Sequence, residues 1–381
     1  MNKPLVSGYF DTKFKKLIDF INSLLIEGEE IGCSVTLFFE GKKIIDIWGG
    51  WQNSNNCTPW QHDTIVSTFS VSKALVSTLG HILVDKKIID LDAKVSKYWP
   101  EFSNNGKDQI LVRQLFSHNC ALSFVDEQLK PGDLYDWNIM LKAIENTSPH
   151  WLPGTKPSYL NMTYGYLIGG LIYKTTGLKL SKFNRLNLSG PLNMDYNFAL
   201  KSYELNRVAT VYKKQADNLF ENSPNKDEDI FFKSMQGFSN NEDFNSIEWR
   251  TGEVGSGQGH GNGRSIAILF EMLRNGGTFN GVNIISKETR DNAIKFQNAS
   301  IGDDPILGIP IRFSLGYELN TKHFYMGPNS NSFGHWGAGG SFGFADIENK
   351  ISFGYTPNLM HDKFELGPRG QKIINIIYNC F

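Results

Sequence analysis

The stretch STFSVSKAL, residues 67–75, places a serine and a lysine three positions apart at the start of an apolar helical run. Ser70 and Lys73 therefore share one face of the predicted helix. A lysine amine beside a serine hydroxyl can accept the hydroxyl proton and create a nucleophile, and the N-terminus of a helix stabilises negative charge that develops there. The stretch predicts a serine nucleophile; the alternative is a helix-capping serine beside an exposed lysine.

The serine–lysine spacing alone does not decide between these alternatives, because it occurs a second time. Ser223 and Lys226 have the same spacing, but a proline lies between them and the surrounding residues 214–248 are polar and rich in asparagine. We interpret this second copy as chance and residues 214–248 as a long surface excursion. Whether that excursion forms a lid stays open.

Two stretches further along the chain bear on the same chemistry. Tyr159 and Asn161 precede or open a second apolar helical run, 160–175, and a tyrosine hydroxyl near the serine–lysine pair can shuttle protons. His335 lies in the glycine-rich stretch FGHWGAGGSFGFAD (333–346). Glycines in a strand mark the close approach of another backbone or of a ligand, and such a strand edge can lend a backbone N–H to an oxyanion.

The two ends of the chain predict one sheet. Residues 12–28 have the apolar spacing of a helix, and residues 32–51 read as two strands joined at Glu40–Gly41. Near the C-terminus two strands surround Glu348–Asn349, and an apolar helical run, 370–381, closes the chain.

The middle of the chain is dominated instead by helical patterns. We therefore expect an α/β (α+β) fold: a mainly antiparallel sheet built from residues 1–64 and 326–381, flanked by N- and C-terminal helices, with a helical domain inserted over residues 65–325. Within that insertion, helices are predicted over 70–86, 110–117, 136–146, 160–175 and 263–275.

The bulk composition excludes several classes of protein. A net charge of −1 over 381 residues provides no basic field for nucleic acid. The four cysteines are scattered, so we expect reduced thiols and no metal site. His118 and His260 are expected to hold loops through hydrogen bonds. The N-terminus lacks the apolar core of a signal peptide and no window is long and apolar enough for a membrane span, so we expect a cytoplasmic protein.

The order of these motifs resembles the serine β-lactamase and penicillin-binding-protein superfamily. Within it the chain is most similar to the class C-like branch, which contains the family VIII carboxylesterases and β-lactamase-domain-containing proteins. The resemblance covers nearly the whole chain and rests on seven strings in order: DIWGGW (46–51), STFSVSKAL (67–75), VRQLFSHNCAL (112–122), YDWN (135–138), WLPGTKPSY (151–159), GHGNGRSIA (259–267) and FGHWGAGGSFGFAD (333–346).

The resemblance implies a catalytic role for each matched residue. Ser70 would be the acylated nucleophile and Lys73 its activating partner. Tyr159 would be either the general base of acylation or an anionic or hydrogen-bonding partner of Lys73. The backbone N–H groups of Ser70 and Ala338 would form the oxyanion hole, and neither a metal nor a cofactor is implied.

The resemblance also implies a substrate-binding set, with two departures. Where lactamases carry the lysine and threonine of a Lys-Thr-Gly strand, this chain has a histidine and a tryptophan. A histidine is neutral much of the time near pH 7 and holds the carboxylate of a penicillin less well than a lysine. The residues expected to bind substrate are Asn161, His335, Trp336 and Gly337.

These features together predict a serine hydrolase that forms an acyl-enzyme, specifically a carboxylesterase acting on short-chain esters. Its partner would be a small-molecule ester or amide. A β-lactamase, a D-amino-acid peptidase or an acyltransferase of the same fold stays open as an alternative. In a different class, a catalytically silent scaffold that forms oligomers also stays open, as do the homo-oligomeric state and the natural substrate.

Overall fold

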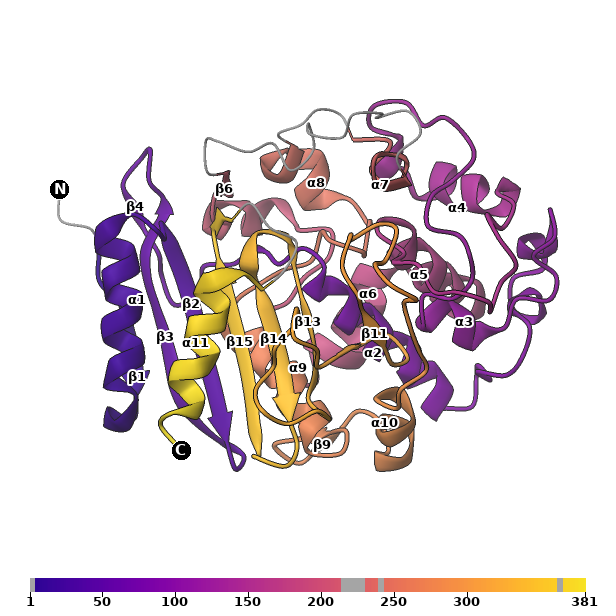
Figure 1. Cartoon of the computed structure of the whole chain (residues 1–381). Helices are drawn as coiled ribbons and strands as arrows, with labels where there is room; N and C mark the ends of the chain where they lie inside the picture. The colour runs from indigo at the N-terminus through magenta and orange to yellow at the C-terminus, as the bar shows by residue number, and fades with distance from the viewer. Residues whose placement is uncertain (1–3, 214–229, 239–242, 362–365) are drawn as a thin grey trace.

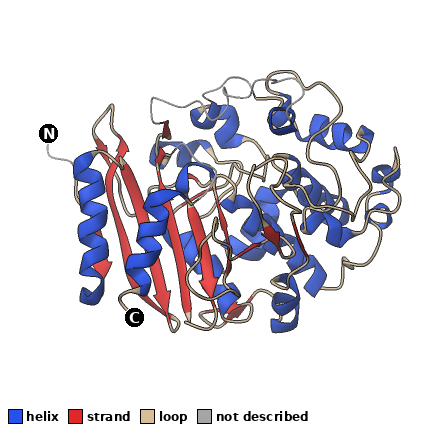
Figure 2. Cartoon of the chain, viewed as in Figure 1, coloured by secondary structure: helices blue, strands red, loops and turns tan. Residues whose placement is uncertain are grey.

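The protein combines a large antiparallel sheet with a helix-rich part, as the computed structural model shows for residues 4–213, 230–238, 243–361 and 366–381 (Figures 1 and 2). The sheet has ten strands in the order β1-β3-β2-β15-β14-β13-β12-β11-β10, with β4 paired to β3. Its strands are β1 (Ser7–Phe10), β2 (Gly32–Phe39), β3 (Lys42–Asn53), β4 (Thr58–Pro59), β10 (Asn298–Ala299), β11 (Arg312–Phe313), β12 (Glu318–Leu319), β13 (Phe333–Trp336), β14 (Phe342–Asp346) and β15 (Ile351–Pro357).

Both ends of the chain contribute to the centre of this sheet. The β2–β3 hairpin turns at Glu40 and Gly41, whose φ angles of 50° and 82° suit the twist of a two-residue hairpin turn. Strand β2 then pairs with β15 near the other end of the chain, with Val35 opposite Tyr355. The antiparallel sheet expected from the two chain ends is therefore confirmed.

Helices cover both faces of the sheet. Helices α1 (Lys15–Glu27) and α11 (Gly367–Tyr378) lie on one face, and α9 (Gly263–Arg274) lies on the other (Figure 1). Helix α9 approaches β15 closely because Gly354 has no side chain: a Cβ there would lie 2.2 Å from the Gly263 carbonyl oxygen. Helix α9 and strands β10 to β12 fall inside the segment 65–325 expected to form the helical domain, yet α9 packs on the sheet and the three strands belong to it. The two-domain boundaries themselves stay a prediction.

Helix α2 (Val71–Asp85) runs through the helix-rich part beside α5 (Thr163–Thr176), and its residues 71–83 are buried. The helix thus lies inside the core although some of its buried residues, such as Lys73 and His81, are polar. The five helices predicted for this region are present within a few residues of the expected bounds. The other α-helices are α3 (Val112–Phe116), α4 (Trp137–Asn146), α6 (Leu180–Asn184), α7 (Ile230–Lys233), α8 (Ile247–Thr251) and α10 (Lys287–Ala293).

Short two-residue strands tie the loops around α2 together. Strand β5 (Val66–Ser67) pairs with β7 (His260–Gly261) just before the helix begins. Strand β6 (Tyr212–Lys213) pairs with β16 (Leu359–Met360). In the described part of the chain, no helix combines the length and the apolarity that crossing a bilayer demands. The predicted excursion 214–248 lies partly outside the described residues. The other short strands are β8 (Thr278–Phe279) and β9 (Val282–Asn283).

Candidate active site

Ser70 and Lys73 meet at the start of α2. Ser70 is the N-cap of the helix, and Phe69 before it has a φ of +48°, so the chain turns sharply there. The Lys73 Nζ lies 3.1 Å from Ser70 Oγ and donates a hydrogen bond to the Ser256 carbonyl oxygen at 2.9 Å. The structure therefore brings together the serine–lysine pair that the spacing predicts.

Burial sets the protonation of Lys73. Its side chain is fully buried, which disfavours the ammonium form and lowers the pKa to about 7, while the carboxylate of Glu318 acts in the opposite direction. A large fraction of this amine is therefore the free base near neutral pH. A free amine 3.1 Å from a serine hydroxyl can accept its proton.

Tyr159 completes the cluster from the loop before α5. Its ring lies under the lysine, with Lys73 Nζ 4.7 Å from the ring centroid. Burial and then Glu318 raise the pKa of Tyr159 well above its ordinary value, although the nearby Ser70 hydroxyl lowers it. The Tyr159 Oη makes no hydrogen bond of normal geometry with any described residue. The phenol is therefore neutral near pH 7, which favours Lys73 rather than Tyr159 as the proton acceptor.

Two residues fix the position of Tyr159, and one of them, Asp304, belongs to none of the motifs. The Asp304 carboxylate accepts a hydrogen bond from the Tyr159 N–H at 2.9 Å, and burial raises the pKa of Asp304 to about 6. His118 Nδ1 accepts from the Leu160 N–H at 2.9 Å, and its ring stacks on Tyr159 at 5.2 Å between centroids. His118 thus holds a loop as expected, whereas the ring nitrogens of His260 have no hydrogen-bond partner among the described residues.

Strand β13 ends against the start of α2, where an oxyanion could be bound by backbone N–H groups. Gly337 makes the approach possible, because a Cβ at this position would lie 2.3 Å from the Thr68 carbonyl oxygen. Within the described residues, neither the Ser70 N–H nor the Ala338 N–H donates to another protein group. Both residues border the same cleft. Two unengaged N–H groups there can stabilise a tetrahedral oxyanion.

The cleft above Ser70 is narrow and apolar. Its cavity volume is about 40 Å³. Asn161 reaches its wall and donates to Ser234 Oγ and Met235 Sδ, each at 3.0 Å. Its lining consists of Phe69, Ser70, Tyr159, Asn161, Met162, Phe231, Met235, Phe244, Trp249, Gly257, Leu307, Trp336 and Ala338.

His335 lies behind this cleft rather than on its wall. Its Nδ1 is 2.8 Å from the Trp336 carbonyl oxygen, to which the protonated nitrogen donates, and burial followed by Lys73 lowers its pKa to about 3. The ring borders a separate small cavity beside Glu318. His335 and Gly337 are therefore not among the described residues that line the cleft, whereas Trp336 is, with its indole stacked on Phe324 at 4.8 Å.

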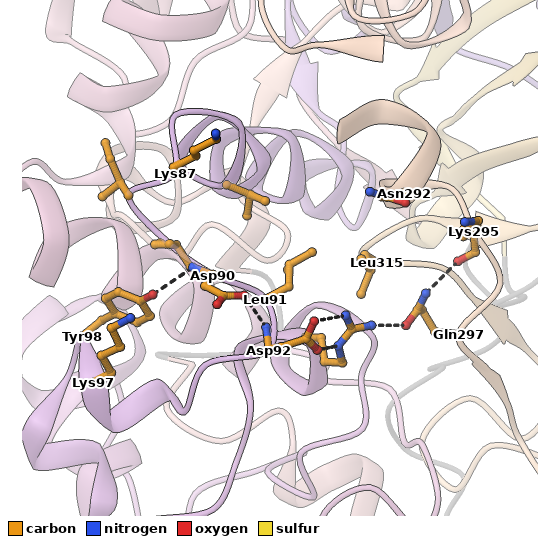
Figure 3. A pocket seen from close by; sticks show the side chains of 14 residues that line it. Lys87, Asp90, Leu91, Asp92, Lys97, Tyr98, Asn292, Lys295, Gln297 and Leu315 are labelled. Carbon is orange, nitrogen blue, oxygen red and sulfur yellow. Dashed lines mark hydrogen bonds and ion pairs between the residues drawn. The ribbon is translucent and has the colours of Figure 1, made fainter. Parts of the chain in front are cut away.

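A larger hollow of about 780 Å³ lies elsewhere, lined by residues that include Val84 at the end of α2 and Asn292 on α10 (Figure 3). It contains none of the residues around Ser70. Two of its charged residues pair with each other: Arg113 donates two hydrogen bonds to the Asp92 carboxylate and a third to Gln297. Nucleophilic catalysis by a serine requires a proton acceptor in contact with the hydroxyl. The smaller cleft at Ser70 meets this requirement and is the candidate active site.

The fold and this site define a hydrolase with the architecture of the serine β-lactamases. The chain matches the family model described as Beta-lactamase over residues 11–375, and it belongs to that family. The resemblance predicted from the motifs is thereby confirmed.

Solved structures and a curated relative agree with this assignment. A family VIII carboxylesterase structure is 32% identical, covers 99% of this chain and 100% of its own, and superposes with a TM-score of 0.90. A penicillin-binding-protein homologue from Caulobacter crescentus is 28% identical at the same coverage, with a TM-score of 0.91. The esterase/beta-lactamase LipL of Mycobacterium tuberculosis is 26% identical over 93% of this chain and 83% of its own.

Proposed function

We propose that this protein is a serine carboxylesterase that acts through an acyl-enzyme on short-chain, uncharged esters. One observation carries the proposal: Lys73 Nζ lies 3.1 Å from Ser70 Oγ at the floor of an apolar cleft. The family VIII carboxylesterase neighbour and the esterase/beta-lactamase relative support an ester as the substrate class.

The geometry supports a two-step reaction. The Lys73 amine takes the proton of Ser70, and the serine oxygen forms a bond to the ester carbonyl carbon. The carbonyl oxygen becomes an oxyanion that the N–H groups of Ser70 and Ala338 stabilise. The carbon–oxygen bond to the alcohol then breaks, the alcohol leaves with the proton held by Lys73, and water releases the acid from Ser70 by the same steps in reverse.

The cleft fits an uncharged substrate better than a penicillin. Among the described residues that line it there is no lysine or arginine, and the histidine that replaces the lysine of the lactamase strand is buried and neutral. A carboxylate entering this apolar space would lose its hydration without gaining a partner. Phenylalanine, tryptophan, methionine and leucine side chains on the wall instead suit an apolar acyl or alcohol group.

The test is hydrolysis of p-nitrophenyl esters of graded acyl length, with nitrocefin measured alongside. We expect Ser70→Ala to lose at least about 10³-fold in kcat, because removing the nucleophile leaves only binding and the oxyanion hole. Ser223→Ala is the matched control, since it alters the second serine–lysine pattern of the chain, and we expect it to retain wild-type rates. A fluorophosphonate should label wild-type protein at Ser70.

The rival functions give different results in the same assays. Nitrocefin hydrolysis faster than ester hydrolysis would assign a β-lactamase. Ser70 acylation followed by transfer to an added alcohol or amine, with little free acid, would assign an acyltransferase. A wild-type protein that neither turns over nor labels, but forms regular assemblies by light scattering, would replace the enzyme with a scaffold.

A further inference from the structure

Asp304 is a buried carboxylate whose two oxygens bind two different parts of the chain. It lies in the loop between β10 and β11, and its residue is fully buried. Its Oδ2 accepts a hydrogen bond from the Tyr159 N–H at 2.9 Å. Its Oδ1 accepts from the Ile306 N–H at 2.9 Å and from the Leu307 N–H at 3.1 Å. One carboxylate therefore ties the loop before α5 to the loop between β10 and β11.

The loop that Asp304 closes forms part of the wall of the active-site cleft. The Gly308 N–H donates to the Asp304 carbonyl oxygen at 2.8 Å, so the chain turns back on this residue. Leu307 in the same turn lines the cleft together with Tyr159. Because the cavity volume is only about 40 Å³, a small movement of Leu307 relative to Tyr159 changes the space that an ester can occupy.

The chain around Tyr159 is held independently of Asp304. The His118 carbonyl oxygen accepts a hydrogen bond from the N–H of residue 158, and its Nδ1 accepts from the N–H of residue 160, each at 2.9 Å. The loop that carries Leu307 has no such second attachment. Among the described residues, the bond from Tyr159 to Asp304 is the one hydrogen bond that joins residues 304–309 to residues 158–160.

The carboxylate form of Asp304 is needed for this double attachment. Burial raises its pKa to about 6, although three backbone N–H groups and Lys156 act in the opposite direction. The group is therefore mostly ionised at pH 8, and both oxygens can accept hydrogen bonds. An asparagine amide has one acceptor oxygen, and its nitrogen donates. An aspartate can thus satisfy both loops at this position, whereas an asparagine can satisfy only one.

We propose that Asp304 is a positioning residue that holds Leu307 against Tyr159 and so limits the size of the ester that the cleft accepts. Asp304 is not among the described residues that line the cleft, so it acts through Leu307 and not by touching the substrate. This inference rests on the proposed serine carboxylesterase function and adds to it the residue that sets the size of its substrate.

The test is a selectivity ratio at pH 8, defined as kcat/KM for p-nitrophenyl hexanoate divided by kcat/KM for p-nitrophenyl acetate. In Asp304→Asn the amide oxygen can keep the bonds to Ile306 and Leu307, and the amide nitrogen then faces the Tyr159 N–H. Two donors repel each other, and because His118 holds the tyrosine, we expect the loop to move and the cleft to widen. The ratio should rise about tenfold, which is the lower end of the discrimination that one methylene produces in an apolar pocket.

The same variant should keep most of its turnover of the small ester. We expect kcat for p-nitrophenyl acetate to fall by less than about 10²-fold, because the groups that transfer the proton stay in place. Ethyl acetate and hexyl acetate repeat the size comparison on the alcohol side of the ester bond. A rise of the ratio in either series supports the inference.

Three further variants separate this role from a general loosening of the fold. Leu307→Ala removes the wall side chain and leaves the carboxylate, so its ratio should also rise. The double variant of Asp304→Asn and Leu307→Ala should not exceed the ratio of Leu307→Ala, because one residue acts through the other. Asp346→Asn is the matched control: Asp346 is also fully buried and binds Asn349 through both oxygens, but it does not line the cleft. We expect it to keep the wild-type ratio.

An unchanged ratio in both ester series for Asp304→Asn or for Leu307→Ala would overturn the inference. So would a double variant whose rise is the product of the two single rises, or an equal rise in Asp346→Asn. Should Asp304→Asn not fold, Asp304→Glu decides by the same criterion, because its extra methylene pushes the loop away from Tyr159. A wild type without Ser70-dependent turnover removes the proposed function and this inference together. A Ser70-dependent wild type with unchanged ratios in the variants removes only the inference.

Discussion

Lys73 and Tyr159 are the two candidates for the general base, and the effect of burial on their pKa values favours Lys73. The same loss of hydration disfavours the charged form of each, which turns the lysine into a free amine and keeps the tyrosine a neutral phenol. A neutral phenol can donate a hydrogen bond but accepts a proton poorly. At the scale of single residues, we therefore expect the lysine to accept the proton and the tyrosine to orient the groups around it.

Lys73→Arg should cost more activity than Tyr159→Phe. A guanidinium stays protonated, so we expect the arginine variant to lose at least about 10³-fold in kcat/KM, within the range that a general base contributes. Phenylalanine keeps the ring under Lys73 and removes only the hydroxyl, so a loss of about 10–100-fold is expected. Ester hydrolysis at pH 8 and labelling of Ser70 measure both. A lower kcat/KM in Tyr159→Phe than in Lys73→Arg would instead identify Tyr159 as the base.

The residues of the site differ in how far the sequence could predict them. Ser70, Lys73 and Tyr159 belong to short patterns that depend on local spacing, and the structure brings all three together. Asp304 and Glu318 lie beside residues far away in the chain, Asp304 beside Tyr159 and Glu318 beside His335. A charged residue within the apolar run FSLGYEL (313–319) was the available signal for Glu318. Its neighbour His335 could not be read from the sequence, because the pairing of β12 with β13 brings the two side chains together.

At the scale of elements, the end of β13 must touch the start of α2 for an oxyanion pocket to exist. Gly337→Ala should disturb this contact, since the added methyl group would lie 2.3 Å from the Thr68 carbonyl oxygen. We expect a loss of about 10²-fold in kcat with a smaller change in KM, because the Ala338 N–H would move away from the developing oxyanion. The free energy of unfolding should fall by about 1–3 kcal/mol.

A glycine remote from the site provides the control for this variant. Gly281 in the turn between β8 and β9 has a φ of +78°, and no other group lies within 4 Å of the point that a Cβ would occupy there. Gly281→Ala should therefore strain only its own turn, lowering the melting temperature without changing kcat per folded molecule. Equal losses of kcat in Gly337→Ala and Gly281→Ala would show that catalysis does not depend specifically on the β13–α2 contact.

Elements defined by local signals could be predicted, and those defined by distant partners could not. Helix α1 ends at Gly28 with a φ of 80°, and the β2–β3 hairpin turns at Glu40–Gly41, as their residue types indicate. Strands β10, β11 and β12 have two residues each, too few for an alternating pattern. Helix α9 has an ordinary amphipathic sequence, and no feature of that sequence indicates that its apolar face packs on the sheet.

At the scale of the whole molecule, a buried ion pair joins the two chain ends behind the active site. Arg369 on α11 lies 2.9 Å from the carboxylate of Glu30, which follows α1, and the Tyr355 hydroxyl also donates to that carboxylate at 2.6 Å. The same guanidinium donates to the Gly339 carbonyl oxygen at 3.2 Å, next to the Ala338 N–H. Arg369 of the C-terminal helix therefore supports the turn that carries Ala338, whose N–H is half of the proposed oxyanion hole.

Arg369→Met should destabilise the protein in a pH-dependent way. It leaves Glu30 buried without its cation, which costs about 3–5 kcal/mol near neutral pH. Burial already raises the pKa of Glu30, and losing Arg369, which lowers it, raises it further. A carboxyl with a raised folded-state pKa contributes its stability below the unfolded-state pKa and loses it as pH rises through the folded value. The deficit in melting temperature should therefore be larger at pH 8 than at pH 5.

Lys350→Met, which breaks the exposed pair with Glu40, should leave the melting temperature near wild type at both pH values. A deficit independent of pH would mean that Arg369 stabilises the fold through its backbone contacts alone.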